Sequence, residues 1–334
     1  MSLGALSDGA AVMQAAPQDA QAVTDALLSV GRWLAGTGYA FTTVTPATQA
    51  RVNGRPQARQ ARTLRDVFGW SRPFAPSLLP EKVVQTLRDA GLAEEVGGGL
   101  LRSLVRFSSL HGGLYAHSAY PTTDDDAVFF GPDTVRFVDL VLGELERRPL
   151  PPGGRVVDVG CGAGPGGLAA VHAARDAGPQ LVLADINPRA LHFAAANAAL
   201  AGQGGVVFAQ GDLFAALDGT FDAIVANPPY LNDAAQRTYR HGGGRFGEAL
   251  SARIVREGLE RLAPGGRLVL YTGVAIAEGQ DALLTQLQPV LQQRGWPWRY
   301  RELDPDVFGE ELDEPAYADA ERIAAVALVI ERPA

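Results

Sequence analysis

One stretch of the chain, residues 155 to 167, constrains the possible folds more than any other. An apolar run ends at Asp158, and five glycines follow between residues 160 and 167, before an Ala-rich segment that begins near Leu168. Glycines allow the backbone to approach a ligand closely, and the N-terminus of a helix favours negative charge. The pattern predicts a buried strand, a ligand-binding turn and a helix, which is the repeating unit of a parallel α/β sheet.

The glycine turn is compatible with two kinds of ligand. A dinucleotide fingerprint fits Gly162, Gly164 and Gly167, but this motif alone is weak evidence. Asp158 precedes the first glycine, and its carboxylate is suited to a cationic amine rather than to a pyrophosphate. The position of Asp158 therefore favours S-adenosylmethionine over a nicotinamide dinucleotide.

A second motif, Asn227-Pro228-Pro229-Tyr230, follows the strand-like run 221–226. The Asn227 amide and the Pro228 carbonyl present two acceptors to one planar NH₂ group, and the Tyr230 ring offers a face for stacking. Holding both N–H bonds directs the nitrogen lone pair toward an electrophile. The alternative is an ordinary turn at the end of a strand, because Asn-Pro and Pro-Pro are common turn sequences.

Together these motifs resemble the Rossmann-like (class I) S-adenosylmethionine-dependent methyltransferases that carry an Asn-Pro-Pro-Tyr signature and act on glutamine or adenine amino groups. The resemblance covers residues 128 to 331. It implies catalytic roles for Asn227, Pro228 and Tyr230. It also implies a cofactor site made by Phe130, Thr134, Asp158, Gly160, Gly162, Gly164, Asp185, Ile186, Asp212, Leu213 and Asn227.

Within this resemblance, Asp185 binds the ribose hydroxyls and Asp212 binds the adenine. Acids at strand ends have an alternative role as helix caps. Phe130 and Thr134 lie in a segment that covers the cofactor in such enzymes, and core packing is the alternative for both. Cys161, within the glycine turn, is interpreted as a packing residue.

The fold class predicted is α/β, with a seven-stranded Rossmann-like sheet in residues 122–334 and a smaller N-terminal domain in residues 1–121. Strands are expected near 155–159, 181–185, 206–210, 221–226, 266–272, 298–303 and 323–330, and the resemblance implies that the last two pair antiparallel. The first 15 residues or so are expected to be frayed.

The N-terminal domain is predicted to resemble a winged helix and to recognise the substrate. Helices are expected at Ala20–Leu34, Arg59–Phe68 and Pro80–Ala90, and residues 36–54 are expected to be a loop or weakly extended. Two β-like runs, 100–110 and 114–120, are expected to form a hairpin.

The composition favours a cytoplasmic enzyme. The 334 residues contain one cysteine, which excludes an intramolecular disulfide framework. No apolar run reaches transmembrane length, and no signal peptide or membrane association is expected. No Cys/His cluster suggests a metal site, and the sequence leaves the oligomeric state open.

Charge is distributed unevenly along the chain. Residues 1–110 contain eleven basic and eight acidic side chains, a net charge of +3, whereas the whole chain carries −8. Six arginines, Arg51, Arg55, Arg59, Arg62, Arg65 and Arg72, are accompanied only by Asp66. This cluster suggests a site for a phosphate-bearing or acidic partner, and a solvated arginine-rich surface is the alternative.

The acceptor of the methyl group remains open among a protein glutamine, a nucleic-acid base and a small molecule. Glutamine methyltransferases usually have an extended acidic-Pro segment after the signature, but here Arg237, Tyr239, Arg240 and His241 follow. His241 is either a base on a mobile lid or a polar loop residue. A non-catalytic S-adenosylmethionine-binding regulator and a nicotinamide-dependent oxidoreductase are further alternatives.

Overall fold

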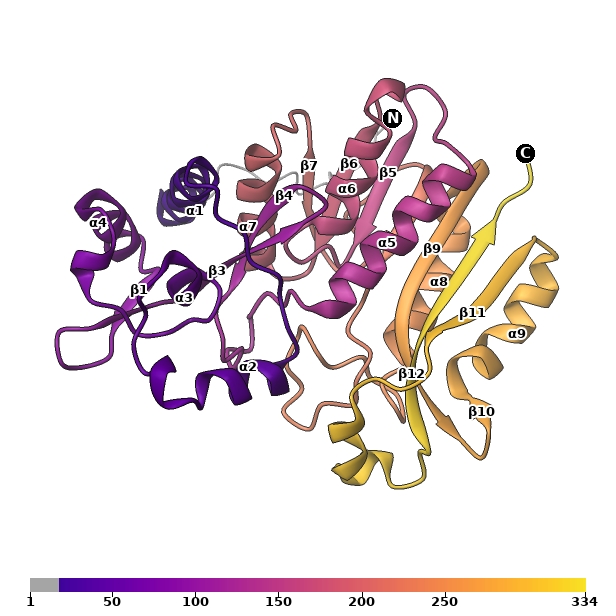
Figure 1. Ribbon diagram of the computed structural model, residues 1–334. Helices are drawn as coiled ribbons and strands as arrows, with labels where there is room; N and C mark the ends of the chain where they lie inside the picture. Colours follow the sequence, from indigo (N-terminus) through magenta and orange to yellow (C-terminus); the bar gives the residue numbers. More distant parts are fainter. Residues whose placement is uncertain (1–17) are drawn as a thin grey trace, which may run out of the picture.

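A sheet of eight strands forms the centre of residues 18–334, the part of the chain that the computed structural model describes (Figure 1). The expectation for residues 1–15 lies outside these residues. Seven strands are neighbours in the order β11-β12-β9-β8-β5-β6-β7, and β10 pairs with β9. The strands are β5 (Arg155–Val159), β6 (Gln180–Asp185), β7 (Val207–Gln210), β8 (Phe221–Ala226), β9 (Leu262–Ala277), β10 (Gln280–Asp281), β11 (Trp298–Asp304) and β12 (Arg322–Glu331).

The strand directions create the crevice in which a ligand can bind. β5 pairs in parallel with β6 on one side and with β8 on the other. Strands β6 and β7 are thus added on one side of β5, and β8 returns to the other side. Such a switch point opens a crevice beyond the carboxyl ends of the strands. β12 pairs antiparallel with both β9 and β11, which confirms the predicted pairing of the last two strands.

The eighth strand, β10, was not predicted. β9 turns back on itself at Glu278 and Gly279, which have φ angles of 52° and 68°. Two consecutive residues with positive φ are typical of a tight β-hairpin turn, and Gln280 and Asp281 then pair with the end of β9. The sheet in residues 18–334 therefore has eight strands rather than seven.

Helices cover both faces of the sheet, as the alternation of strands and helices predicts. Val156 joins the hydrophobic cluster on one face and its neighbour Val157 joins the cluster on the other, because successive side chains of a strand point to opposite faces. On the first face lie α5 (Pro132–Arg147), α6 (Pro165–Ala173) and α7 (Pro188–Leu200); on the second lie α8 (Ala249–Arg261) and α9 (Ala282–Arg294).

The N-terminal part contains more elements than predicted. Within residues 18–121 the structure has α1 (Gln18–Gly36), α2 (Pro46–Asn53), α3 (Leu64–Phe68) and α4 (Glu81–Asp89), with the strands β1 (Ala93–Glu95), β2 (Leu101–Ser103), β3 (Val105–Leu110) and β4 (Gly113–Ser118). The hairpin β3–β4 is confirmed. β2, however, separates from β3 at Leu104 and pairs with β1, which was not predicted.

Two predicted boundaries in this part are wrong for local reasons. The segment 36–54 is not a loop throughout, because Thr45 accepts a hydrogen bond from the Thr48 amide and Pro46 opens helix α2. Helix α3 begins at Leu64 rather than near Arg59, since Thr63 and Asp66 form a capping box there. The part thus has one helix and one hairpin more than the winged-helix-like arrangement that was predicted.

The N-terminal part packs directly on the sheet domain. Helix α1 lies against α7, and a Cβ atom at Gly31 would come within 2.6 Å of a Leu200 methyl group, so a larger residue would require the Leu200 side chain to move. The buried Asn197 side chain of α7 accepts a hydrogen bond from the Ala116 amide of β4 (2.7 Å) and donates one to the Ala116 carbonyl (3.0 Å). Within residues 18–334, no helix is long and apolar enough to cross a membrane.

Candidate active site

A cavity of about 560 Å³ lies at the carboxyl ends of the parallel strands. This volume is in the range of small-molecule sites. Eleven residues predicted for the site line it: Thr134, Asp158, Gly160, Gly162, Asp185, Ile186, Asp212, Leu213, Asn227, Pro228 and Tyr230. Phe130 and Gly164 do not line it.

The glycine turn after β5 places backbone at the wall of the cavity. Gly160 and Gly162 have φ angles of 69° and 53°, which favour glycine. The Gly162 amide donates to Asp185 Oδ2 at 2.8 Å and so connects the turn to the end of β6. Gly164 has another role than predicted. It begins α6 with φ 81°, and a Cβ there would lie 3.0 Å from Leu183, in the core.

Asp158 is a buried carboxylate at the end of β5. Its Oδ2 accepts a hydrogen bond of 2.7 Å from the Gly167 amide at the start of α6. Burial raises the pKa of Asp158 to about 7, with a further rise from Asp185, although the Gly167 amide opposes the shift. A cationic group in the cavity would stabilise the ionised form of this carboxylate.

Asp185 at the end of β6 is held by two backbone amides. Besides the bond from Gly162, Asp185 Oδ1 accepts a hydrogen bond from the Asn187 amide at 2.8 Å. Burial raises the pKa of Asp185, and these amides oppose the shift. The next residue, Ile186, is 55% exposed although it is aliphatic, so it gives the cavity an uncovered apolar wall beside the carboxylate.

Asp212, beyond β7, is less tightly held. It is half-exposed and forms an ion pair with Arg253 at 3.0 Å. The following residue, Leu213, has φ 51°, which is an unusual conformation for a leucine. Strained residues of this kind are common at ligand sites, and both residues line the cavity.

The Asn-Pro-Pro-Tyr motif follows β8 directly. No residue from 18 to 334 forms a hydrogen bond with the Asn227 side chain or with the Pro228 carbonyl, and both residues line the cavity. Tyr230 is more buried than expected. A Cβ at Gly273 would lie 2.4 Å from its ring, and Phe308 packs against it edge-to-face at 5.8 Å. The motif therefore presents two free acceptors beside a firmly packed ring.

A model of the methyltransferase small domain matches residues 136–286, which include the glycine turn, the strand-end acids and the Asn-Pro-Pro-Tyr motif. The match covers residues 136 to 286, which is less than half of the 334-residue chain.

Curated relatives fall into two groups. A release factor glutamine methyltransferase of Deinococcus radiodurans is 35% identical over 200 residues, which is 57% of this chain and 66% of that protein. A second one, of Koribacter versatilis, is 32% identical over 182 residues, 50% of this chain and 63% of that protein. A ribosomal RNA small subunit methyltransferase C of Sodalis glossinidius is 36% identical over 129 residues, 39% of this chain and 32% of that protein. The chain thus spans less than two thirds of the length of each relative.

The segment just before residue 136 corrects one predicted site residue and retains another. Phe129 lines the cavity in place of Phe130, because neighbouring residues of an extended segment point to opposite sides. The Phe130 ring instead stacks on His117 at 5.0 Å. Thr134 caps α5 by accepting a hydrogen bond from the Gly131 amide at 3.2 Å, and it also lines the cavity.

Asp133 is a buried carboxylate that the sequence analysis missed. It accepts a hydrogen bond of 2.6 Å from the Tyr271 hydroxyl and pairs with Arg136 at 3.1 Å. Burial raises the pKa of Asp133. Burial and the nearby Asp133 carboxylate together raise the pKa of Tyr230. An acid in the first turn of a helix usually serves the helix terminus, so its position in the sequence did not point to the cavity.

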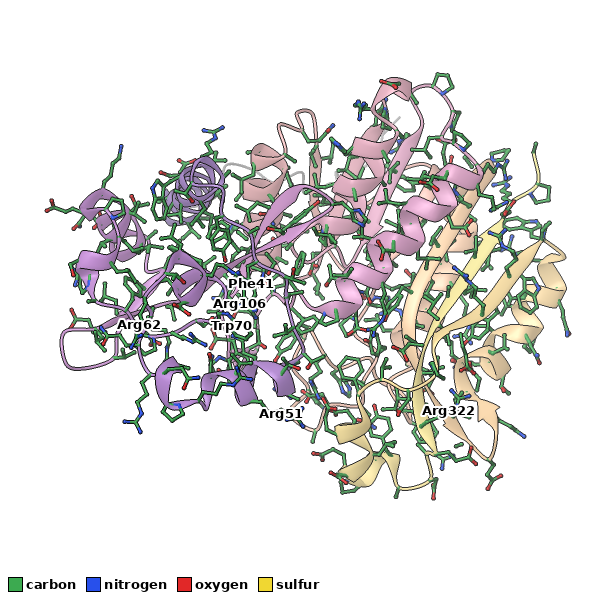
Figure 2. All side chains as sticks on the ribbon, viewed as in Figure 1. Phe41, Arg51, Arg62, Trp70, Arg106 and Arg322 are labelled. Atoms are coloured by element: carbon green, nitrogen blue, oxygen red, sulfur yellow. The ribbon has the colours of Figure 1, made fainter. Side chains whose placement is uncertain are left out.

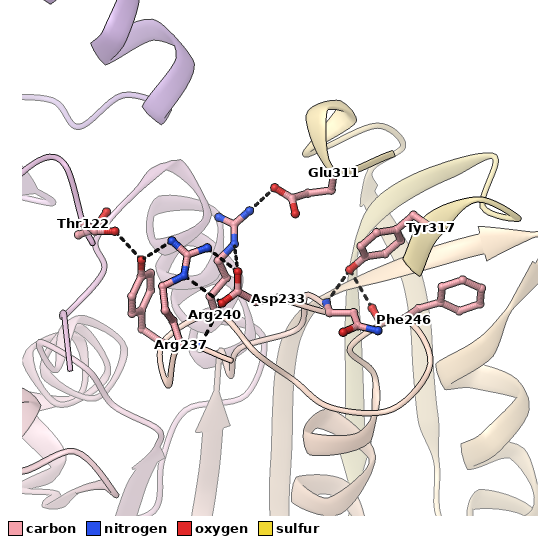
Figure 3. A network of polar contacts seen from close by, with 9 residues as sticks. Thr122, Asp233, Arg237, Arg240, Phe246, Glu311 and Tyr317 are labelled. Carbon is pink, nitrogen blue, oxygen red and sulfur yellow. Dashed lines mark hydrogen bonds and ion pairs between the residues drawn. The ribbon is translucent and has the colours of Figure 1, made fainter. Parts of the chain in front are cut away.

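A roof of polar contacts covers the cavity (Figure 3). We define the roof as residues 231–248 with residues 308–317. Asp233 pairs with Arg237, and hydrogen bonds from Arg237 lower the pKa of Asp233. Arg240 pairs with the buried Glu311. The Tyr317 hydroxyl accepts a hydrogen bond from the Asn232 amide at 2.7 Å and donates one to the Phe246 carbonyl at 3.1 Å.

The roof is also attached to the junction between the two parts, since the Tyr239 hydroxyl donates to the Thr122 carbonyl at 2.6 Å. Tyr239, Arg240 and His241 line the cavity from this side. His241 Nδ1 is buried and has no hydrogen-bond partner among the described residues. The sequence analysis pointed only to the roof residues that follow the Asn-Pro-Pro-Tyr motif. It missed Glu311 and Tyr317.

Proposed function

We propose that the protein transfers a methyl group from S-adenosylmethionine to a planar NH₂ nitrogen. The observation that carries the proposal is the pair of free acceptors at Asn227 and Pro228, in the same cavity as the strand-end acids. A planar NH₂ group has two N–H donors, and this pair of acceptors can satisfy both.

The residues of the donor side fit the cofactor. Asp158 is a buried carboxylate suited to the cationic methionyl amine, and Asp185 offers acceptors for two ribose hydroxyls. Ile186 gives the adenine an apolar surface, and Asp212 lies beyond it at the end of the next strand. When bound, the cofactor supplies a methyl carbon already activated for attack by its sulfonium.

On the acceptor side, the chain positions the nitrogen and excludes water. The Asn227 side chain and the Pro228 carbonyl hold the two N–H bonds, which aims the nitrogen lone pair toward the donor side of the cavity. The roof limits access by water. The nitrogen loses a proton after methyl transfer, so a strong base is not essential.

We propose a protein glutamine amide as the acceptor, with residues 1–121 recognising the substrate and residues 122–334 carrying out the transfer in the cytoplasm. Two relatives named release factor glutamine methyltransferases support this choice. An exocyclic amino group of an RNA base is the second candidate. It is favoured by the relative named ribosomal RNA small subunit methyltransferase C and by the arginine-rich residues 51–72.

The test is methyl transfer from radiolabelled S-adenosylmethionine to separated protein, RNA, DNA and metabolite fractions, with Asn227→Ala as the control. We expect label in one macromolecular fraction, and mass spectrometry of the digested product should place the methyl group on nitrogen. A methyl group on oxygen or carbon would contradict the proposal. S-adenosylmethionine binding without turnover on any fraction would favour the non-catalytic regulator.

A further inference from the structure

The surface formed by α2, α3 and the segment between them carries a row of unpaired arginines. We name it the arginine face and define it by Arg51, Arg55, Arg59, Arg62 and Arg65. All five are exposed, and none forms an ion pair within residues 18–334. Figure 2 labels two of them, Arg51 and Arg62, on the N-terminal part of the molecule. We propose that the arginine face binds the phosphate backbone of RNA.

The charge of this face is not neutralised locally. Residues 46–80 contain six arginines and one acid, Asp66, which gives a net charge of +5 (6 − 1). Asp66 is already engaged, because it pairs with Arg72 and accepts hydrogen bonds from the Arg62 and Thr63 amides, each at 3.0 Å. Five guanidinium groups therefore remain available to an external anion.

Guanidinium groups suit phosphate in particular. Their planar N–H groups bind phosphate oxygens in pairs, and arginine cannot lose its proton at neutral pH. The five side chains also have no evident role in folding, since they form no side-chain hydrogen bonds with residues 18–334. Because the Debye length is about 8 Å at physiological salt, a ligand at this face senses the nearby arginines rather than the net charge of the whole chain.

The position of the arginine face connects it to the active site. Helix α2 begins at Pro46, which lines the cavity, and it leads away from the cavity toward Arg55. The opposite rim belongs to residues 304–321, which contain eight acids and no basic residue. Phe308, Glu310 and Glu311 of that segment line the cavity. In Figure 1, α2 and this yellow segment before β12 lie at the same end of the molecule.

Opposite charges on the two rims orient a polyanion. The acidic segment repels phosphate and the arginine face attracts it, so an RNA strand would pass along α2 with one edge at the cavity. The inference goes beyond the proposed function, because the arginine face lies outside the methyltransferase domain and serves either acceptor. If the acceptor is an RNA base, the arginine face would bind the RNA that contains it. If the acceptor is a glutamine, the face would bind RNA attached to the protein that carries the glutamine.

The test is fluorescence anisotropy of labelled single-stranded RNA of mixed sequence, without cofactor, over a series of salt concentrations. The double variant R55E/R59E is compared with the control R256E/R301E, which reverses two exposed and unpaired arginines elsewhere. We expect R55E/R59E to weaken binding at least about tenfold and to reduce the salt slope by about 1.4, at about 0.7 per phosphate contact. The control should remain within about twofold of the wild type.

The proposal would be overturned if the wild type did not bind RNA, if both variants lost binding equally, or if poly-glutamate at matched charge bound equally tightly. Tight binding of poly-glutamate would assign the arginine face to an acidic protein. DNA of the same sequence serves as a further probe, and tighter binding of DNA than of RNA would contradict the choice of RNA. Thermal unfolding checks that the variants fold. Because no methyl transfer is measured, a failure of the proposed reaction would leave the RNA result unaffected.

Discussion

The two sides of the candidate active-site cavity are built in different ways. On the donor side, Asp158 and Asp185 lie at the ends of adjacent strands and are held by amides of nearby turns. On the acceptor side, the contacts connect residues far apart in the chain, such as Arg240 with Glu311 and Asn232 with Tyr317. The donor side is thus fixed by local backbone geometry, whereas the acceptor side depends on how two distant loops meet.

This difference predicts that substitutions separate into two groups. Changes on the donor side should alter cofactor affinity, and changes on the acceptor side should alter turnover or the use of the acceptor. A substitution that altered cofactor affinity and turnover equally would contradict this separation into two groups.

Asn227→Ala should have the largest effect. It removes one acceptor of the substrate NH₂ group, which matters most as the nitrogen attacks, so turnover should fall by about 10²–10³. Cofactor affinity should stay within a few-fold, because Asp158, Asp185 and Asp212 remain. Steady-state kinetics and calorimetry with S-adenosylmethionine measure the two quantities. Near-normal turnover by a folded variant would contradict the amino-nitrogen mechanism.

Asp185→Ala should weaken cofactor binding by about 1–3 kcal/mol, because the ribose hydroxyls lose their acceptors. The Gly162 amide would also lose its partner, which loosens the glycine turn. Calorimetry measures the dissociation constant, and turnover at saturating cofactor should be much less affected. An unchanged dissociation constant in a folded variant would remove Asp185 from the site.

Cofactor affinity should depend on pH through Asp158. Burial raises the pKa of Asp158 to about 7, so the carboxyl becomes neutral as the pH falls below that value and attracts the methionyl amine less. Affinity should decrease by up to about tenfold per pH unit below 7 and stay level above it. Asp158→Asn should bind weakly at every pH, with a flat profile. A flat profile in the wild type would show that Asp158 does not bind a cation.

The same pKa shift affects stability. The folded pKa is raised above its ordinary value of 3.8, so the folded protein retains a proton that the unfolded chain loses. The empty fold is therefore destabilised as the pH rises from about 4 to about 7. The increase in melting temperature on adding S-adenosylmethionine should accordingly be greater at pH 8 than at pH 6.

Glu311→Gln should have the smallest effect. It weakens the pair with Arg240 and loosens the roof, so kcat/KM for the acceptor should fall by about three- to tenfold, equivalent to roughly 1 kcal/mol. Glu314→Gln is the matched control, because Glu314 lies in the same segment and is exposed, does not line the cavity and has no ion pair within residues 18–334. Cofactor affinity should not change in either variant. A loss of cofactor affinity in Glu311→Gln alone would show that the roof also serves the donor side.

The sequence predicted which strand-end acids line the cavity, because the signals for these positions are local. A strand ending in an acid places that acid at the rim of a parallel sheet, whatever the rest of the chain does. Asp158, Asp185 and Asp212 therefore all line the cavity. Gly164 was misassigned because both a turn that contacts a ligand and a close approach to Leu183 require glycine, and the motif does not distinguish them.

The acceptor side was less predictable. Whether Phe129 or Phe130 faces the cavity depends on the orientation of an irregular segment, which has no repeating pattern. Glu311 lies in an acidic stretch and becomes important only because Arg240 meets it after folding. Helix α2 was overlooked because half of its eight residues are polar and its signal is the cap at Thr45 rather than apolar spacing.

The buried amide of Asn197 has a consequence for how the enzyme would select its substrates. It bonds both backbone groups of Ala116 in the N-terminal part and also donates to the Ala163 carbonyl of the glycine turn at 2.9 Å. One side chain thus joins the part proposed to recognise the acceptor to the turn proposed to hold the cofactor. If acceptor binding shifts β4, this hydrogen-bonded connection would change the cofactor affinity. By thermodynamic reciprocity, the cofactor would then change the acceptor affinity by the same factor.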